Sequence, residues 1–325
     1  MKTSQRAGNV LDRSALDFLG TTAWHAAAAE PITGDASARK YFRLRKDNQS
    51  AILMDASRVL ETVAPFVLVS RHLRRLGFSA PATLARDDRK GFLLLEDFGD
   101  DTFARLLDSQ CEPEKLFTLA TDVLIALHQH PRAIPKGMRA YHPQKMLADI
   151  ELFLEWLTPA ISEVGKAEFR AVWLEVLPVA HQVPASLLLR DYHAANLMLL
   201  PKRRGIRRAG LLDFQDAYQG PITYDLMSLL EDARREVPDG LRDKMLARYL
   251  ARFPTLDRNA FETSLAILAA LRHTRVLAIF ERLSRREGKH DYKQFHSPRV
   301  ERRLQRALRH PMLAGVKRWM ERHAR

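Results

Sequence analysis

Residues 187–217, LLLRDYHAANLMLLPKRRGIRRAGLLDFQDA, limit what this chain can fold into more than any other stretch. Three short apolar runs, around residues 187–189, 196–200 and 210–214, predict three buried strands. Asp191 follows the first run, Asn196 comes five residues later, and a basic turn after the second run leads to Asp213. Because a hairpin returns the chain to the edge that it left, we expect these two carboxylates and the amide around one small volume.

The transfer of a phosphoryl group from a nucleotide to a hydroxyl needs such a set of side chains. A carboxylate must lie near the attacking hydroxyl, and oxygen ligands must hold Mg²⁺ on the phosphates. Asp191 is therefore the candidate catalytic base, and Asn196 and Asp213 are the candidate Mg²⁺ ligands. Each Asp taken singly is better explained as a loop cap. The three residues together, each with an apolar strand beside it, favour a kinase.

Asp225 lies just before an apolar helix. A plain helix cap is one explanation. A buried carboxylate that accepts backbone N–H groups and braces the catalytic loop is the other, and we favour it.

The order of the remaining segments predicts the fold class. KYFRLRK and SAILMDA flank the turn DNQS and predict a hairpin, and SAPATLAR and GFLLLED predict two more strands. Apolar residues at helical spacing predict a helix over 61–76, ended by Gly77. From Asp101 onward most segments are amphipathic helices. We predict an α+β fold with a small β-rich N-lobe, residues 1–97, and a large α-helical C-lobe, residues 98–325.

Composition narrows the class of protein. The single cysteine, Cys111, rules out a disulfide within the chain. We find neither an apolar stretch of signal-peptide length at the N-terminus nor a segment near the roughly 18 apolar residues of a membrane span. These features predict a cytoplasmic protein with no membrane span.

The net charge of +13 is concentrated near the C-terminus. Residues 272–325 hold 16 Lys and Arg and 5 Asp and Glu, a balance of 16 − 5 = +11. Such a region suits an anionic small substrate, an anionic membrane or nucleic acid, or is a set of solvated helix faces. Few aromatic residues interrupt it, which argues against nucleic acid.

The chain resembles the aminoglycoside phosphotransferase and choline kinase superfamily, which has a protein-kinase-like fold. The resemblance runs through GDASARKYFRL, GFLLLEDFG, RDYHAANLMLL and GLLDFQDAYQGPITYDLMSLLEDAR. Within that superfamily, the YFR, RDYH and LLDFQDA segments are most similar to bacterial kinases of cell-wall sugar recycling. Those enzymes phosphorylate the anomeric hydroxyl of N-acetylmuramic acid and N-acetylglucosamine. The resemblance implies ATP as the donor, with GTP left open, Mg²⁺ as cofactor and a small amino sugar as substrate.

The resemblance also implies residue roles. Asp191 matches the catalytic base, Asn196 and Asp213 match the Mg²⁺ ligands, and Asp225 matches the brace. The loop from Gly34 through Ser37 to Arg39 matches the phosphate-covering loop, and Glu96 to Phe98 match the adenine-binding hinge.

Two features depart from the superfamily pattern. The His usually found two residues before the catalytic Asp is Leu189 here. The strand AILMDA lacks the nucleotide-binding Lys, and the helix over 64–76 lacks the Glu that would pair with it. Both partners are absent together, which indicates replacement, by Arg39, Lys40 or Arg43. Strand alternation puts Arg43 with Tyr41 on one face and Lys40 with Phe42 on the other, and leaves open which face meets the nucleotide.

The acceptor is the least determined part. His193 is a candidate hydrogen-bond partner for a sugar hydroxyl, or a loop His without substrate contact. Arg275, with Arg282 seven residues on, is a candidate for a substrate carboxylate such as the lactyl group, or part of a solvated face. The basic C-terminal region favours a neutral or anionic amino sugar over a cationic aminoglycoside.

Two alternatives remain open: a kinase of another small alcohol, aminoglycoside or choline-like, and a non-catalytic pseudokinase whose basic tail binds RNA or a partner. The sequence makes no prediction of the oligomeric state.

Overall fold

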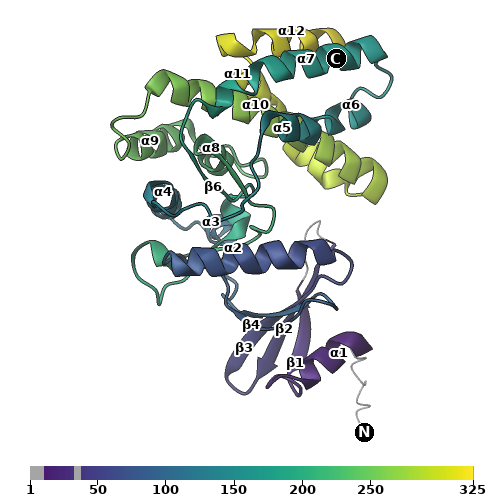
Figure 1. The fold of residues 1–325 in the computed structure, drawn as a ribbon, viewed down its shortest axis with the longest axis vertical. Helices are drawn as coiled ribbons and strands as arrows, with labels where there is room; N and C mark the ends of the chain where they lie inside the picture. Colours follow the sequence, from purple (N-terminus) through teal and green to yellow (C-terminus); the bar gives the residue numbers. More distant parts are fainter. Residues whose placement is uncertain (1–10, 33–37, 325) are drawn as a thin grey trace. The chain divides into compact units, whose positions relative to one another are not determined.

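The computed structural model describes residues 11–32 and 38–324 of the chain. They form two compact units (Figure 1). The first unit comprises Met1–Thr102 together with Met198–Asp216, and the second comprises Phe103–Leu197 together with Ala217–Arg325. The functional division into a nucleotide-binding lobe, 1–97, and a catalytic lobe, 98–325, remains a proposal.

The first unit is built on an antiparallel sheet of five strands in the order β1-β2-β3-β5-β4. Its strands are β1 (Ala28–Ile32), β2 (Lys40–Lys46), β3 (Gln49–Asp55), β4 (Thr83–Asp87) and β5 (Phe92–Glu96). The expected hairpin is confirmed as β2 and β3, which pair from Lys40 with Asp55 to Lys46 with Gln49. Asp47 lies in its turn at a φ of 52°.

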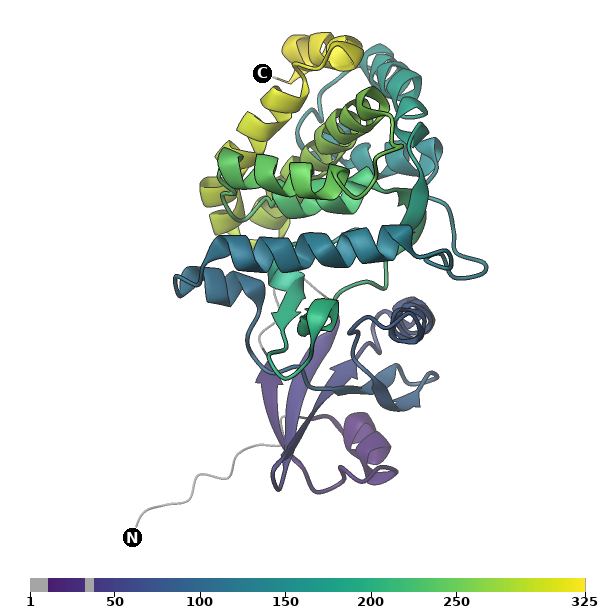
Figure 2. The ribbon, with the colours of Figure 1, turned by 90° about the vertical axis from the view of Figure 1, so that its left-hand side faces the viewer.

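Two helices accompany this sheet. Helix α1 (Arg13–Gly20) lies against one face (Figure 2), and Asp12 caps it by accepting a hydrogen bond from the backbone N–H of Ala15 at 2.8 Å. The core on that face joins α1 to the strands through Ala15, Phe18, Leu19, Phe42, Leu44, Ala51, Leu53, Phe92 and Leu94. The predicted second helix is α2 (Val63–Arg75), and Gly77 follows it at a φ of 89°. Sequence patterns had not predicted α1.

The first unit also contains the hairpin of β7 (Leu197–Leu199) and β8 (Ala209–Leu211), which leads to Asp213. The backbone N–H of Leu199 donates to the carbonyl of Asp101, and that of Leu211 donates to the carbonyl of Ser79, each at 2.7 Å. Gly210 must be small, because a Cβ there would lie 2.7 Å from the ring of Phe98.

The second unit is mainly helical (Figure 1). Its helices are α3 (Phe103–Asp108), α4 (Pro113–Gln129), α5 (Pro143–Ile150), α6 (Leu152–Trp156), α7 (Glu163–Val176), α8 (Thr223–Leu230), α9 (Asp239–Leu250), α10 (Arg258–Glu287), α11 (Ser297–Ala307) and α12 (Ala314–His323). Strand β6 (Ala185–Leu188) pairs antiparallel with β9 (Tyr218–Pro221). The pairing holds the residues from which the loops after the two strands begin.

Helix α10 is the centre of this second unit and packs against α5, α6, α8 and α11. Among residues 11–32 and 38–324, it is the one helix long and apolar enough to cross a membrane, with a mean hydropathy of 1.3 in its best window. Sequence patterns had not predicted such a segment. However, 83% of that window is buried inside the protein, as expected for the core helix of a folded unit.

Candidate functional site

The loop after β6 carries the predicted catalytic base, and a buried carboxylate fixes its backbone. Asp225, in the first turn of α8, is 1% exposed. Its two oxygens accept hydrogen bonds from the backbone N–H groups of Leu189, at 2.5 Å, and Arg190, at 2.9 Å. Burial raises the pKa of Asp225 to about 7, although the two N–H groups act to lower it. The predicted contact between Asp225 and the loop is therefore present.

Arg190 gives this loop its shape at a conformational cost. Its φ of 70° is in the left-handed region, which L residues rarely adopt. The side chain is held in place by an ion pair with Asp149 at 2.6 Å, and its guanidinium lies 5.1 Å from the ring centroid of Tyr141 and 5.3 Å from that of Tyr218. Sequence patterns had not singled out Arg190 or Asp149 as parts of the site.

Asp191 remains one-third exposed at the end of this loop. Burial would raise its pKa, but the positive charges of Arg272 and Arg275 outweigh that effect and lower the pKa to about 2. The nearer guanidinium, of Arg272, lies 3.5 Å from Asp191 Oδ1. Asp191 is therefore an anion that can accept a hydrogen bond from a neutral hydroxyl.

Asn196 lies in the same loop, at the end of a single turn of 3₁₀ helix. Its side-chain Nδ2 donates to the backbone carbonyl of Asp191 at 2.9 Å. This bond orients the amide of Asn196 relative to Asp191 and closes the loop.

His193 is also buried in this loop, at 5% exposure. Its Nε2 lies 3.3 Å from Arg234 Nη1 and 3.4 Å from Asn196 Nδ2, which are both donors. Nε2 must therefore be the acceptor, and the ring is neutral with its proton on Nδ1. Burial also lowers the pKa of His193. Within the described residues Nδ1 is buried and has no hydrogen-bond partner, and a contact of His193 with a sugar hydroxyl stays a prediction.

Asp213, the third residue of the predicted set, belongs to the first unit. It follows β8 at a φ of 57°, and its carboxylate accepts from Arg39 Nη2 at 2.7 Å and from Gln215 Nε2 at 3.0 Å. Phe214 next to it is buried and stacks on Phe66 of α2, with ring centroids 5.0 Å apart. The stacked ring anchors the backbone that carries Asp213.

The predicted nucleotide contacts of this unit differ in their surroundings. Arg43 is held by Asp97, at 2.8 Å, and Asp100, at 2.7 Å, so its guanidinium stabilises the turn after β5. Arg39 instead brings an 8% exposed guanidinium onto Asp213. Glu96 accepts from Arg203 at 2.5 Å.

Of the other nucleotide candidates, Phe98 packs against Gly210. Lys40 is exposed at the start of β2, whereas its alternation partner Phe42 points into the core shared with α1. Gly34 and Ser37 lie outside the described residues.

Two candidate Mg²⁺ ligands were predicted, an amide in one unit and a carboxylate in the other. Across the described ranges, no three His, Cys, Asp or Glu side chains gather closely enough to hold a metal ion. An amide oxygen and a carboxylate oxygen are each of the kind that Mg²⁺ takes, and it takes few of its ligands from protein. The 38% exposed side chain of Asp213 is consistent with such a ligand.

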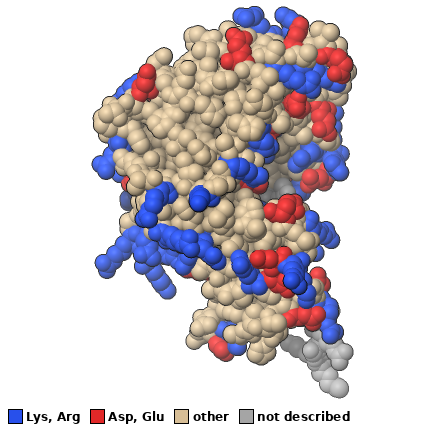
Figure 3. All heavy atoms as spheres, viewed as in Figure 1, with Lys and Arg blue, Asp and Glu red and all other residues tan. Residues whose placement is uncertain are grey.

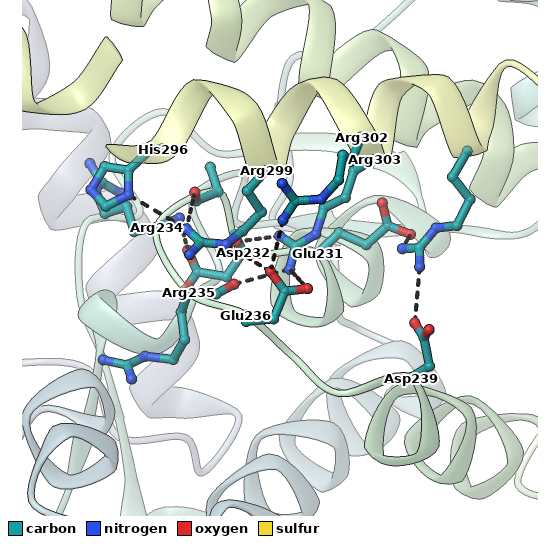
Figure 4. Close-up of polar contacts among 12 residues, drawn as sticks. Glu231, Asp232, Arg234, Arg235, Glu236, Asp239, His296, Arg299, Arg302 and Arg303 are labelled. Atoms are coloured by element: carbon teal, nitrogen blue, oxygen red, sulfur yellow. Dashed lines mark hydrogen bonds and ion pairs between the residues drawn. The ribbon is translucent and has the colours of Figure 1, made fainter. Parts of the chain in front are cut away.

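Many cations of the basic C-terminal region are used within the second unit. Figure 4 shows arginines of α11 holding the loop after α8: Arg299 contacts Glu236 at 2.9 Å, and Arg303 donates to the carbonyl of Arg235 at 3.0 Å. Ion pairs engage Arg272, Arg285, Lys289, Lys293, Arg299, Arg302, Arg303, Arg306, Lys317 and Arg322. Arg303 and Arg306 link α11 to the segment after α8, and Arg322 links α12 to α7, so part of this charge is used within the unit.

An exposed basic group lies on the first unit, at one end of α2 (Figure 3). We call it the α2 patch, and it consists of the exposed residues Arg71, Arg74, Arg75, Lys202, Arg204, Arg207 and Arg208. Ser79 Oγ donates to the carbonyl of Arg207 at 2.7 Å, which joins the hairpin to the segment after α2. Within this patch, Arg74 is paired with Glu96.

The fold and the loop that carries Asp191 define a bilobal, protein-kinase-like enzyme, as the sequence predicted. The model of the phosphotransferase enzyme family matches residues 28–262, and the chain belongs to this family. It is therefore a phosphotransferase.

Curated relatives are similar over most of their length. The N-acetylmuramate/N-acetylglucosamine kinase of Caulobacter vibrioides is 35% identical over 94% of this chain and 94% of its own. The proteins of the same name from Pseudomonas putida and Neisseria meningitidis serogroup B are 31% and 34% identical, over 87% and 80% of this chain and 85% and 79% of theirs.

Solved structures share the fold at low sequence identity. A choline/ethanolamine kinase family protein from Mesorhizobium loti has a TM-score of 0.64 at 15% identity, covering 95% of this chain and 98% of its own. The GDP and kanamycin complex of APH(2″)-IIia has a TM-score of 0.62 at 13% identity, covering 91% and 97%. These similarities confirm the predicted α+β, protein-kinase-like fold with a small β-rich and a large helical lobe.

Proposed function

We propose that this chain transfers the γ-phosphate of ATP to the anomeric hydroxyl of an N-acetyl amino sugar, N-acetylmuramate or N-acetylglucosamine. The observation that carries the reaction class is the loop from Arg190 to Asn196, which holds an ionised Asp191 in a fixed position. The acceptor class is supported by curated relatives named as kinases of these two sugars.

Asp191 acts as the catalytic base of the proposed reaction. Its low pKa keeps it ionised at neutral pH, so it accepts a hydrogen bond from the acceptor hydroxyl and orients the oxygen for attack. A carboxylate this weakly basic takes the proton late, as the bond to phosphorus forms. Asp225 keeps the loop in place by binding the N–H groups of the two residues before Asp191.

Asn196 and Asp213 are the proposed Mg²⁺ ligands. A bound Mg²⁺ would neutralise charge on the nucleotide phosphates. The bond from Asn196 to the carbonyl of Asp191 links the position of this ligand to that of the base.

Arg39 is the proposed replacement for the missing N-lobe lysine. Its contact with Asp213 puts a nearly buried guanidinium beside a proposed Mg²⁺ ligand, whereas Arg43 is engaged by Asp97 and Asp100. A guanidinium can bind phosphate oxygens in a bidentate manner. Gly34 and Ser37 are the proposed phosphate-covering residues, and the backbone from Glu96 to Phe98 is the proposed adenine hinge.

We place the reaction in the cytoplasm, where ATP is available, and in the reuse of cell-wall sugars. The test is to incubate the purified chain with ATP, Mg²⁺ and one acceptor at a time, and to measure ADP. We expect turnover with N-acetylmuramate and N-acetylglucosamine and none with kanamycin or choline. Turnover with only kanamycin or only choline would reject the amino-sugar assignment, and replacing ATP by GTP identifies the preferred donor.

A further inference from the structure

Asp149 neutralises two of the cations beside the loop that carries Asp191. It forms an ion pair with Arg190 at 2.6 Å and a short ion pair with Lys145, and it accepts a hydrogen bond from Tyr141 Oη at 2.8 Å. Asp149 therefore has little capacity left to balance further positive charge.

Arg272 of α10 is also fully engaged. It is 5% exposed, donates to the carbonyl of Arg190 at 3.1 Å, and lies 3.5 Å from Asp191 Oδ1. Its role is to hold the loop and the charge of the base.

Arg275 follows Arg272 by three residues on α10. Residues at this spacing share a helix face, so Arg275 lies one turn further along the face that meets Asp191. The Arg275 side chain is half-buried, and it makes no ion pair or hydrogen bond with any residue that the structure describes. Its positive charge lowers the pKa of both Asp191 and Asp149, in keeping with its place on that face of the helix.

Positive and negative side chains alternate around Asp191. The cations are Lys145, Arg190, Arg272 and Arg275, and the carboxylates that act on the same groups are Asp149, Asp191, Asp225 and Asp232. A half-buried guanidinium without a partner favours an anionic ligand, because an ion pair would offset the cost of its lost solvation. A polycationic acceptor would be repelled by Arg275.

We propose that Arg275 binds the carboxylate of an acidic amino sugar, namely the lactyl group of N-acetylmuramate, and so sets the preference between the two sugars. This inference rests on the proposed function. The lactyl ether is on C3 of the sugar and the acceptor hydroxyl is on C1, with one ring carbon between them. The residue that binds the lactyl carboxylate must therefore lie within about one sugar ring of the residue that binds the C1 hydroxyl. Asp191 and the turn of α10 that carries Arg275 are neighbours of this kind. N-acetylglucosamine lacks the lactyl group and does not use Arg275.

The test combines enzyme variants with acceptors that differ in one charge. kcat/KM is measured for the wild type, Arg275→Gln and Arg275→Lys with three acceptors: N-acetylmuramate, its lactyl amide, which is neutral, and N-acetylglucosamine. For Arg275→Gln we expect a loss of roughly 10- to 100-fold with N-acetylmuramate, the range for a hydrogen bond to a charged group. We expect a change of less than about threefold with the two neutral acceptors, and partial recovery in Arg275→Lys, which keeps the charge.

The matched control is Arg286→Gln, which removes an exposed arginine from the same helix and should leave all three acceptors unchanged. Equal losses with charged and neutral acceptors would overturn the inference, because Arg275 would then act on Asp191 rather than on the substrate. An unchanged preference in Arg275→Gln would also overturn it. Activity of any variant with N-acetylglucosamine shows that it is folded. Failure of the wild type with both sugars would reject the proposed function itself.

Discussion

Replacing Asp225 by Asn tests how the catalytic loop is held. Asn keeps the size of the side chain but turns one of its two acceptors into a donor, which then faces the backbone N–H of Leu189 or Arg190. A buried N–H left without an acceptor costs about 1–3 kcal/mol. The left-handed conformation of Arg190 costs ~1–2 kcal/mol in the wild type and in the variant alike, so it does not add to the difference. We therefore expect Asp225→Asn to lower the free energy of unfolding by about 1–3 kcal/mol.

The loop that carries Asp191 should also lose its fixed position in this variant. Chemical denaturation gives the change in stability, and kcat measured where the variant is still fully folded gives the effect on the loop. The matched control is Asp239→Asn, which removes an 81% exposed carboxylate paired with Arg306. Exposed pairs contribute about 1 kcal/mol or less. Equal stability and equal kcat for the two variants would refute the role assigned to Asp225.

The pH dependence of stability provides a second measurement on Asp225. Burial raises its pKa to about 7, whereas an unfolded Asp titrates near pH 4. Between about pH 4 and pH 7 the folded chain keeps a proton on Asp225 that the unfolded chain has released. This proton binding stabilises the folded chain fully below about pH 4, and the stabilisation decreases as the pH rises and is lost above about pH 7. The wild type should therefore lose stability relative to Asp225→Asn between pH 5 and pH 8, and parallel stability curves would contradict the raised pKa.

Three further predictions concern the base, the nucleotide and the surface. The pKa of Asp191 is about 2, so the carboxylate is ionised above about pH 4 and is protonated only below that pH. Between pH 5 and 8, kcat should therefore not decrease towards the acid side because of Asp191. Arg39→Gln should raise the KM for ATP by roughly tenfold, the effect of losing a charged hydrogen bond, and Lys40→Gln, on an exposed residue, should not. An unchanged KM in Arg39→Gln would refute the replacement of the missing lysine. The double variant Arg204→Glu with Arg207→Glu reverses two charges of the α2 patch and should lower the salt concentration that elutes the chain from heparin. Unchanged elution would show that the patch is not the main polyanion-binding surface.

Local patterns predicted the elements that depend on neighbouring residues. The turn DNQS and the alternation beside it are enough to specify β2 and β3, and the apolar run with Gly77 is enough to specify α2. The proximity of Asn196 to Asp191 also followed from a short loop.

Features set by distant contacts were not predictable. Strand β9, with Gly and Pro in four residues, has a weak strand pattern and forms because β6 offers a partner. The charge run of the C-terminal region gave no sign that Arg303 would be buried on backbone carbonyls of the loop after α8. The conformation of Arg190 depends on Asp225, which is 35 residues away in sequence. Such contacts join segments whose local patterns carry no information about each other.

The product of the reaction tests the central claim most directly. Wild-type enzyme and Asp191→Asn are incubated with ATP, Mg²⁺ and N-acetylmuramate, and the products are examined by ³¹P NMR with coupling to the sugar protons. The proposed mechanism predicts phosphate on C1 with the wild type and a rate about 10²- to 10⁴-fold lower with Asp191→Asn, the usual contribution of a general base. Phosphate on another carbon, or undiminished turnover in Asp191→Asn, would contradict it.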